Sequence, residues 1–195
     1  MTEQPGSGPV PSAALLDLGH AALAACRSAL RRVGNADLAR PTPCAEYTLA
    51  DLEEHLVRSM VLLGGCAGAQ LGPADGATVD GRISPLGEAT LSAWAARGLG
   101  GEVPLGSRML PAEQVYTIVL LELVVHGWDV ARAMSTSADS DLDFTVPTQV
   151  VDHLLGQAPV LITADKRGRA FAQAVEVAAD AAPLQRLIAF TGRTP

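Results

Sequence analysis

The segment PAEQVYTIVLLELVVHGWDVARAM, residues 111–134, has the strongest helical pattern in the chain. Steps of four and three residues, which place side chains on one stripe of an α-helix, connect Val115, Val119, Glu122, His126, Asp129 and Ala133. The stripe is apolar in its first half and ionisable in its second half. The pattern therefore predicts a helix that packs against a core and carries a polar site into it.

Three more segments around this helix are predicted to be helical. Residues 13–33 repeat leucine at helical spacing. Residues 49–71 follow Thr48, a candidate N-cap that has Asp51 three positions later in a weak version of the capping box. Residues 85–97 form a shorter predicted helix. Together these segments predict a mainly all-α protein built on an antiparallel four-helix bundle.

The rest of the chain is predicted to be irregular or mixed. We expect a disordered tail at residues 1–10 and a single domain over residues 11–195. Within this domain the bundle takes up residues 11–134, and a small mixed C-terminal segment takes up residues 135–195. The finer expectations are an extended connector at residues 40–46, a loop at 72–84, a turn-rich stretch at 98–110, helices at 147–156 and 183–190, and a strand at 170–177.

The composition excludes some partners. The chain has 14 basic and 21 acidic residues and a formal net charge of -7, with no block of Lys or Arg longer than two residues, so we expect no nucleic acid. The most apolar stretch, residues 115–125, is short and interrupted by Glu122, so we expect no membrane span. Three cysteines without a C-x-x-C motif predict free thiols and a cytoplasmic protein.

Three ionisable side chains are expected to point into the bundle from two helices. Glu122 and His126 are four residues apart, so their side chains lie over one another on a helix. On the helix predicted at residues 49–71, a similar stripe places His55 toward the core. A buried carboxylate needs a partner, which could be a protonated histidine, an arginine or a metal ion.

His55, Glu122 and His126 make a set of two histidines and one carboxylate. This set is typical of catalytic zinc sites with an open fourth position and equally fits non-haem iron. The ligand set alone therefore does not determine which metal binds. The simpler alternative is a hydrogen-bonded core pair without metal. Asp129, one turn after His126, is expected to hydrogen-bond a ligand rather than bind the metal. Arg58, one turn after His55, is the candidate cofactor-binding residue, because it could meet a carboxylate.

Two other residues are given structural roles by the sequence. Cys44 is interpreted as a small side chain that pins the connector, since no base is visible beside it. Arg193 is expected to tie the C-terminus to the bundle by hydrogen bonds rather than to bind substrate.

Three segments carry the motifs of a known family. They are PTPCAEYTLADLEEHLV at residues 41–57, ELVVHGWDVARA at residues 122–133 and RLIAFTGRTP at residues 186–195. They resemble the metal-binding domain of mycothiol-dependent maleylpyruvate isomerases, a DinB-like family. The chain departs from the family pattern in two places. Tyr47 stands where this family usually has tryptophan, and residues 72–110 carry no recognised motif. These departures affect the expected shape of the pocket more than the expected metal binding.

The resemblance implies a DinB-like bundle that binds a divalent metal through His55, Glu122 and His126, usually zinc, with nickel or iron as alternatives. It also implies mycothiol as the cosubstrate and a small electrophile as the substrate of an isomerase or S-transferase. One carboxylate and two neutral imidazoles would leave a bound dication with a net charge of about +1, which would stabilise a thiolate. We expect a monomer or a homodimer.

Two alternatives to a thiol-dependent enzyme stay open at this point. One is a non-catalytic metal- or ligand-binding module, because a fold and a set of ligands do not specify a reaction. The other is a metal hydrolase, for which Asp129 is the only base that the sequence offers.

Overall fold

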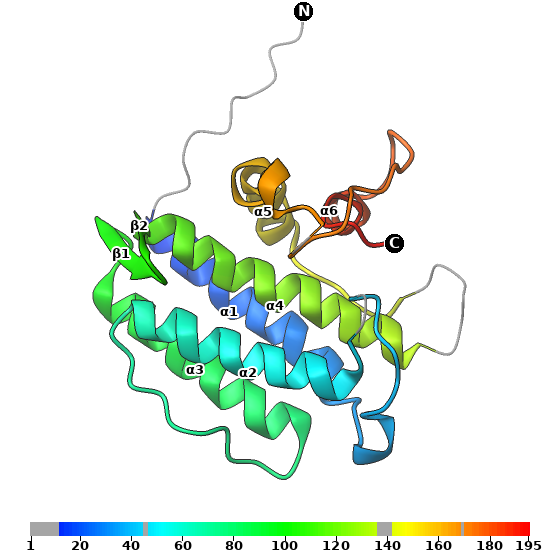
Figure 1. The fold of residues 1–195 in the computed structure, drawn as a ribbon, viewed down its shortest axis with the longest axis horizontal. Helices are drawn as coiled ribbons and strands as arrows, with labels where there is room; N and C mark the ends of the chain where they lie inside the picture. The colour runs from blue at the N-terminus through cyan, green and yellow to red at the C-terminus, as the bar shows by residue number, and fades with distance from the viewer. Residues whose placement is uncertain (1–11, 45–46, 136–141, 169) are drawn as a thin grey trace, which may run out of the picture.

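The computed structural model describes residues 12–44, 47–135, 142–168 and 170–195, so the tail predicted at residues 1–10 lies outside the described residues. Four long helices form a bundle (Figure 1). They are α1 (Ser12–Leu30), α2 (Leu49–Cys66), α3 (Val79–Arg97) and α4 (Ala112–Met134). The prediction of a mainly α-helical protein is confirmed.

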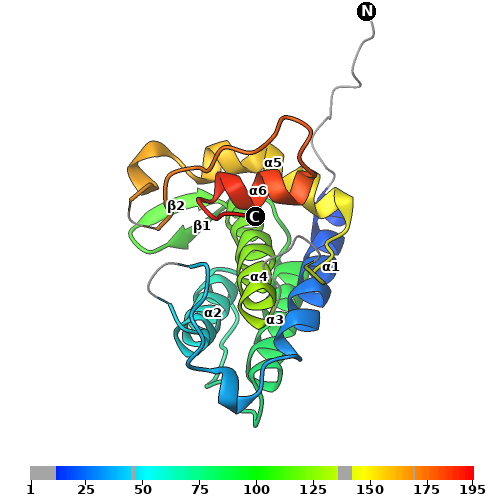
Figure 2. The ribbon, with the colours of Figure 1, turned by 90° about the vertical axis from the view of Figure 1, so that its right-hand side faces the viewer.

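Shorter elements surround the bundle. Strands β1 (Glu102–Leu105) and β2 (Arg108–Pro111) pair as an antiparallel hairpin between α3 and α4. Helices α5 (Thr148–Leu161) and α6 (Pro183–Phe190) pack against each other beside α4 (Figure 2). Two 3-10 turns, η1 (Asn35–Asp37) and η2 (Ala164–Lys166), complete the described elements.

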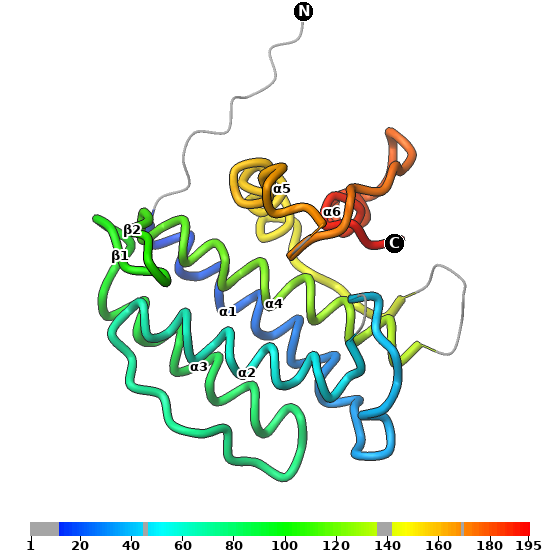
Figure 3. Tube along the Cα trace, in the orientation of Figure 1, coloured from blue at the N-terminus to red at the C-terminus, as the bar shows by residue number. Residues whose placement is uncertain are grey.

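The helices of the bundle run in two directions. The side chain of Thr90 donates a hydrogen bond to the carbonyl of Met60, and that of Trp94 donates to Leu63, so α2 and α3 run in the same direction. α1 and α4 run together in the opposite direction, and the segment from α2 to α3 returns along the bundle (Figure 3). α2 and α4 are therefore antiparallel, which brings the second turn of α2 opposite the middle of α4.

α4 is the central helix of the fold. It packs against α1 and α2 within the bundle and against α5 outside it, and residues 123–131 are all buried. By length and composition alone, α1 and α4 would each be long and apolar enough to cross a membrane. In α4, however, 83% of the apolar window is buried inside the protein. Burial against neighbouring helices therefore accounts for the apolar character of α4.

The start of α3 differs from the prediction. α3 begins at Val79 rather than at residue 85, because the side chain of Thr78 accepts a hydrogen bond from the amide of Gly81 and caps the helix there. The loop predicted at residues 72–84 is correspondingly shorter. Pro85 then lies inside α3, where its ring is exposed.

The ends of two other helices also differ. α2 ends at Cys66 rather than near residue 71, because Gly68 turns the chain with a φ of +87°, which L side chains rarely adopt. α5 continues through Pro159 to Leu161, past the end predicted at residue 156. A proline this close to the end of a helix removes one backbone hydrogen bond without breaking the turns before it.

The strand predicted at residues 170–177 is wrong. In the described part of this segment, an isolated bridge joins Phe171 to Arg167, and the chain then runs irregularly beside α6. The amide of Val175 donates a hydrogen bond to the carbonyl of Ala189, so a helix end takes the place of a partner strand. Alternating apolar residues form a strand only where another strand can pair with them.

Candidate metal centre

The start of α2 is held in place by a capping box. The side chain of Thr48 accepts a hydrogen bond from the amide of Asp51, and Asp51 Oδ2 accepts from the amide of Thr48 at 2.9 Å. The hydroxyl of Thr48 also donates to Asp51 Oδ2, and this bond, together with the one from the amide of Thr48, holds the pKa of Asp51 below its ordinary value. The cap sets the rotation of α2, and His55 in its second turn faces α4.

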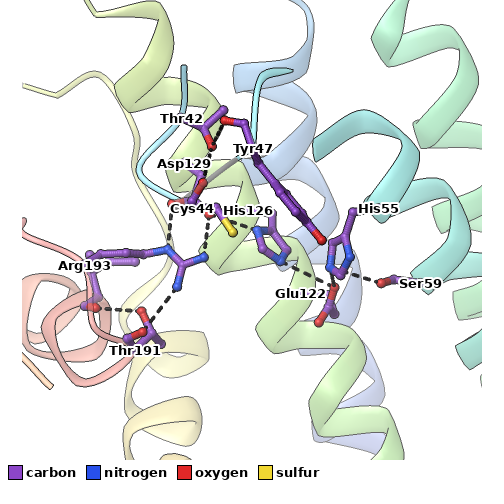
Figure 4. Close-up of polar contacts among 11 residues, drawn as sticks. Thr42, Cys44, Tyr47, His55, Ser59, Glu122, His126, Asp129, Thr191 and Arg193 are labelled. Atoms are coloured by element: carbon purple, nitrogen blue, oxygen red, sulfur yellow. Dashed lines mark hydrogen bonds and ion pairs between the residues drawn. The ribbon is translucent and has the colours of Figure 1, made fainter. Parts of the chain in front are cut away.

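Three side chains from α2 and α4 converge on one point (Figure 4). His55 Nε2 lies 2.9 Å from Glu122 Oε2, and His126 Nε2 lies 3.6 Å from the same oxygen. The two imidazole rings are 4.7 Å apart and nearly perpendicular. The structure thus brings together the three residues that the sequence predicted as metal ligands.

The spacing of these atoms fits a divalent metal ion. Zinc binds nitrogen and oxygen ligands at about 2.0–2.1 Å, which separates two ligands of a tetrahedron by roughly 3.3 Å. The observed distances of 2.9 and 3.6 Å lie on either side of this value. The side chains of His55 and Glu122 remain 28% and 19% exposed, so a fourth ligand could reach the centre from solvent.

The second nitrogen of His126 is engaged by a buried carboxylate. His126 Nδ1 lies 2.9 Å from Asp129 Oδ2, and Asp129 also accepts two hydrogen bonds from Arg193. Burial raises the pKa of Asp129, but the hydrogen bonds from His126 and Arg193 outweigh this effect and lower it. When His126 is neutral, an ionised Asp129 favours the tautomer that is protonated at Nδ1, which leaves the lone pair of Nε2 free for a metal ion.

Glu122 is ionised near neutral pH in spite of its position between helices. Burial raises its pKa, but without a metal ion the hydrogen bond from His55 and the attraction of the two imidazoles in their protonated form outweigh this effect and bring the pKa down to about 2. Ser59, one turn after His55, also lies within hydrogen-bond distance of His55 Nε2. The centre therefore offers one anionic and two imidazole donors to a cation.

Two residues that precede α2, Cys44 and Tyr47, also lie near the centre. Cys44 Sγ lies within 4.8 Å of donor atoms of both His126 and Asp129, whereas the sequence assigned Cys44 only to packing. The ring of Tyr47 lies 5.8 Å from that of His55. An antiparallel bridge between Pro41 and Thr48 closes this segment on itself just before α2.

Arg58 lies in a different environment from the three predicted ligands. Its guanidinium pairs with Glu54 at 3.2 Å on the exposed side of α2. Both residues line a pocket of about 390 Å³ that also includes Glu53 and Arg82 and is formed between α2 and α3. The lining of this pocket does not include His55, Glu122 or His126. The role of Arg58 in binding a cofactor stays a prediction.

Thiol labelling of the native protein should distinguish the three free cysteines. Cys26 is buried, and burial raises the pKa of its thiol to about 12, so it should remain unlabelled by a maleimide near neutral pH. Burial also raises the pKa of the Cys44 and Cys66 thiols, but both side chains are only partly buried, so they should react more slowly than a free thiol. Mass spectrometry is expected to find two labels before unfolding and three in denaturant. A label on Cys26 in the native protein would contradict the packing of α1.

The fold and the centre define a helical bundle with candidate metal ligands on facing helices. The chain belongs to the family of the mycothiol maleylpyruvate isomerase N-terminal domain, whose model matches residues 19–131. The match includes all three predicted ligands and ends before α5 and α6.

Two relatives cover most of the chain. They are uncharacterized proteins of Mycobacterium tuberculosis, one from strain CDC 1551 / Oshkosh and one from strain H37Rv. Each is 30% identical over 165 residues, which is 80% of this chain and 85% of the relative. No solved structure was found to match the chain.

Proposed function

We propose that this protein binds a divalent metal ion, most simply zinc, through His55, Glu122 and His126. We further propose that it acts in the cytoplasm as a thiol-dependent isomerase or S-transferase on a small electrophile, with mycothiol as the cosubstrate. The observation that carries the proposal is the convergence of the three donor atoms within 4.8 Å of one another. Membership in the mycothiol-related family supports the choice of thiol.

The charges of the centre support binding of an anionic ligand. A bound divalent ion would supply positive charge that lowers the pKa of a thiol at the open position, so that the thiol binds as a nucleophilic thiolate. Glu122 neutralises only part of that charge, and the two imidazoles contribute none when they are neutral. A thiol and an electrophile would approach beside His55, because its side chain is 28% exposed and the ring of Tyr47 lies 5.8 Å from its own.

The same thiolate could perform either reaction. Addition to the carbon of an activated cis double bond turns it into a single bond, rotation follows, and loss of the thiolate restores the double bond in the trans form. This isomerisation needs no oxidant or reductant. In an S-transferase, the adduct takes up a proton and is released instead.

The test compares wild type with His126→Ala. Wild-type protein purified without added metal should hold close to one equivalent of metal and consume mycothiol in the presence of small electrophiles such as activated alkenes. His126→Ala should lose both properties, because His126 contributes one of the three donors. His20→Ala is the matched control, since His20 lies on α1 with an exposed side chain and should leave both properties unchanged.

Two outcomes would contradict the proposal. Wild-type protein with less than about a tenth of an equivalent of metal would refute the metal site, because a tightly held ion survives purification. Wild-type protein that holds its metal but consumes no thiol with any electrophile would support a non-catalytic binding module instead.

A further inference from the structure

An arginine near the end of the chain is buried against the metal centre. Arg193 is 8% exposed, and its Nε and Nη2 donate to the two carboxylate oxygens of Asp129 at 2.7 and 2.8 Å. A planar guanidinium that binds both oxygens fixes the plane of the carboxylate as well as its position. Asp129 itself is completely buried, so its orientation is set by protein groups.

The turn after α6 aims Arg193 at α4. α6 ends at Phe190, and Gly192 then turns the chain with a φ of +90°. A Cβ at Gly192 would also lie 2.8 Å from the backbone carbon of Ala172. The amide of Arg193 closes the turn by donating to the carbonyl of Ile188. The C-terminal segment therefore delivers the guanidinium to one place on α4 (Figure 4).

Arg193 and His126 share one acceptor. Asp129 Oδ2 accepts from Arg193 Nη2 at 2.8 Å and lies 2.9 Å from His126 Nδ1. The carboxylate that Arg193 holds in place is thus the group that holds the imidazole of His126. Two successive contacts, Arg193 to Asp129 and Asp129 to His126, therefore connect the C-terminal segment to the imidazole. The other ring nitrogen, His126 Nε2, lies 3.6 Å from Glu122 Oε2.

We propose that Arg193 is a positioning residue of the metal centre: through Asp129 it keeps His126 in the tautomer and orientation that present Nε2 to the metal. The inference rests on the metal site proposed above. It assigns a role to residues after the bundle, because Arg193 lies outside the region, residues 19–131, that the family model matches.

The test uses Arg193→Met and Arg193→Lys in the full chain. Methionine keeps the apolar stem and removes every donor, and lysine keeps the charge but cannot bind both carboxylate oxygens. Affinity for zinc is measured by competition with a chelator, and the ligand geometry by the visible absorption of the cobalt-substituted protein. Arg193→Met should weaken zinc binding roughly 10- to 100-fold, the usual cost of losing a group that holds a ligand. Arg193→Lys should fall between it and wild type.

A second readout needs no metal. Nitrogen NMR of the imidazoles in metal-free protein should show His126 protonated at Nδ1 in wild type and a mixture of the two tautomers in Arg193→Met. Arg186→Met is the matched control, because Arg186 is an exposed residue of α6. It should leave the affinity, the cobalt spectrum and the tautomer unchanged.

The possible results separate the two proposals. Wild type that fails to bind zinc or cobalt would refute the metal site, and the tautomer measurement would then decide the role of Arg193 alone. Wild-type affinity, spectrum and tautomer in Arg193→Met would overturn the inference. If Arg193→Met does not fold, Arg193→Lys replaces it in the test. Wild-type affinity, spectrum and tautomer in Arg193→Lys would then overturn the inference, because lysine cannot bind both carboxylate oxygens.

Discussion

Glu122→Gln is expected to abolish the stabilisation that zinc gives to this protein. Zinc at roughly a thousand times its Kd should stabilise the native wild type by about 4 kcal/mol, because it binds the folded chain and not the unfolded one. Glutamine removes the anionic ligand at the point where both Nε2 atoms converge, so the gain should fall close to zero. Urea unfolding with zinc and with a chelator, near neutral pH, measures the gain in each protein.

The control for this experiment lies on the same helix. Glu113 is an exposed residue in the first turn of α4, and Glu113→Gln makes the same chemical change away from the centre. It should retain the full gain from zinc. A full gain in Glu122→Gln would place the bound zinc elsewhere in the protein and refute the assignment of Glu122.

Without zinc, the free energy of unfolding of Glu122→Gln should already be lower than that of wild type. The pKa of Glu122 is lowered from 4.5 to about 2, because the histidines around it outweigh the effect of burial. A carboxylate with a lowered pKa stabilises the native state above pH 4.5, and this contribution is lost as the pH falls toward 2. The difference between wild type and Glu122→Gln in chelator should therefore shrink in acid. The gain from zinc is compared within each protein for this reason.

Gly19→Ala is expected to destabilise the bundle by about 3 kcal/mol, through overpacking and the loss of a buried hydrogen bond. A Cβ at Gly19 would lie 2.0 Å from Oη of Tyr116 and 2.7 Å from a methyl group of Leu91. Tyr116 is fully buried, and its hydroxyl donates to the carbonyl of Leu16 at 2.8 Å, so it cannot move without losing that bond. The higher helix propensity of alanine, about 1 kcal/mol, offsets only part of this cost.

Gly65→Ala is the matched substitution for Gly19→Ala. Gly65 also lies in a helix, near the end of α2, but a Cβ there would meet nothing within 4 Å. Gly65→Ala should therefore leave stability unchanged or raise it by about 0.5 kcal/mol, from helix propensity alone. Free energies of unfolding in urea compare the two variants. Equal values for both would mean that α1 and α4 do not approach each other at Gly19 as closely as the structure describes.

The bundle could be predicted largely from local patterns. The helix predicted at residues 111–134 appears as α4, Ala112–Met134, and the helix predicted at residues 183–190 appears as α6. The cap predicted at Thr48 forms, and the stripe that it orients points His55 at α4. Caps and apolar spacing act within a few turns of one helix, so they can be recognised from the sequence.

The candidate site was predicted in part. The positions of His55, Glu122 and His126 on inward stripes were enough to expect them near one another, and the structure brings them together. Their role as metal ligands stays a prediction. The surroundings of Arg58 could not be predicted, because its position one turn after His55 does not indicate that it pairs with Glu54 beside a separate pocket.

The sequence by itself determined which residues form the main helices and which faces of those helices are apolar or ionisable. Only the tertiary structure decided that Cys44 lies beside His126, that the segment at residues 170–177 is not a strand, and that Arg193 binds Asp129. Helix periodicity and capping depend on neighbours along the chain. A hydrogen bond between residues 64 positions apart depends instead on how the turn after α6 places Arg193 beside α4, and no local pattern records that.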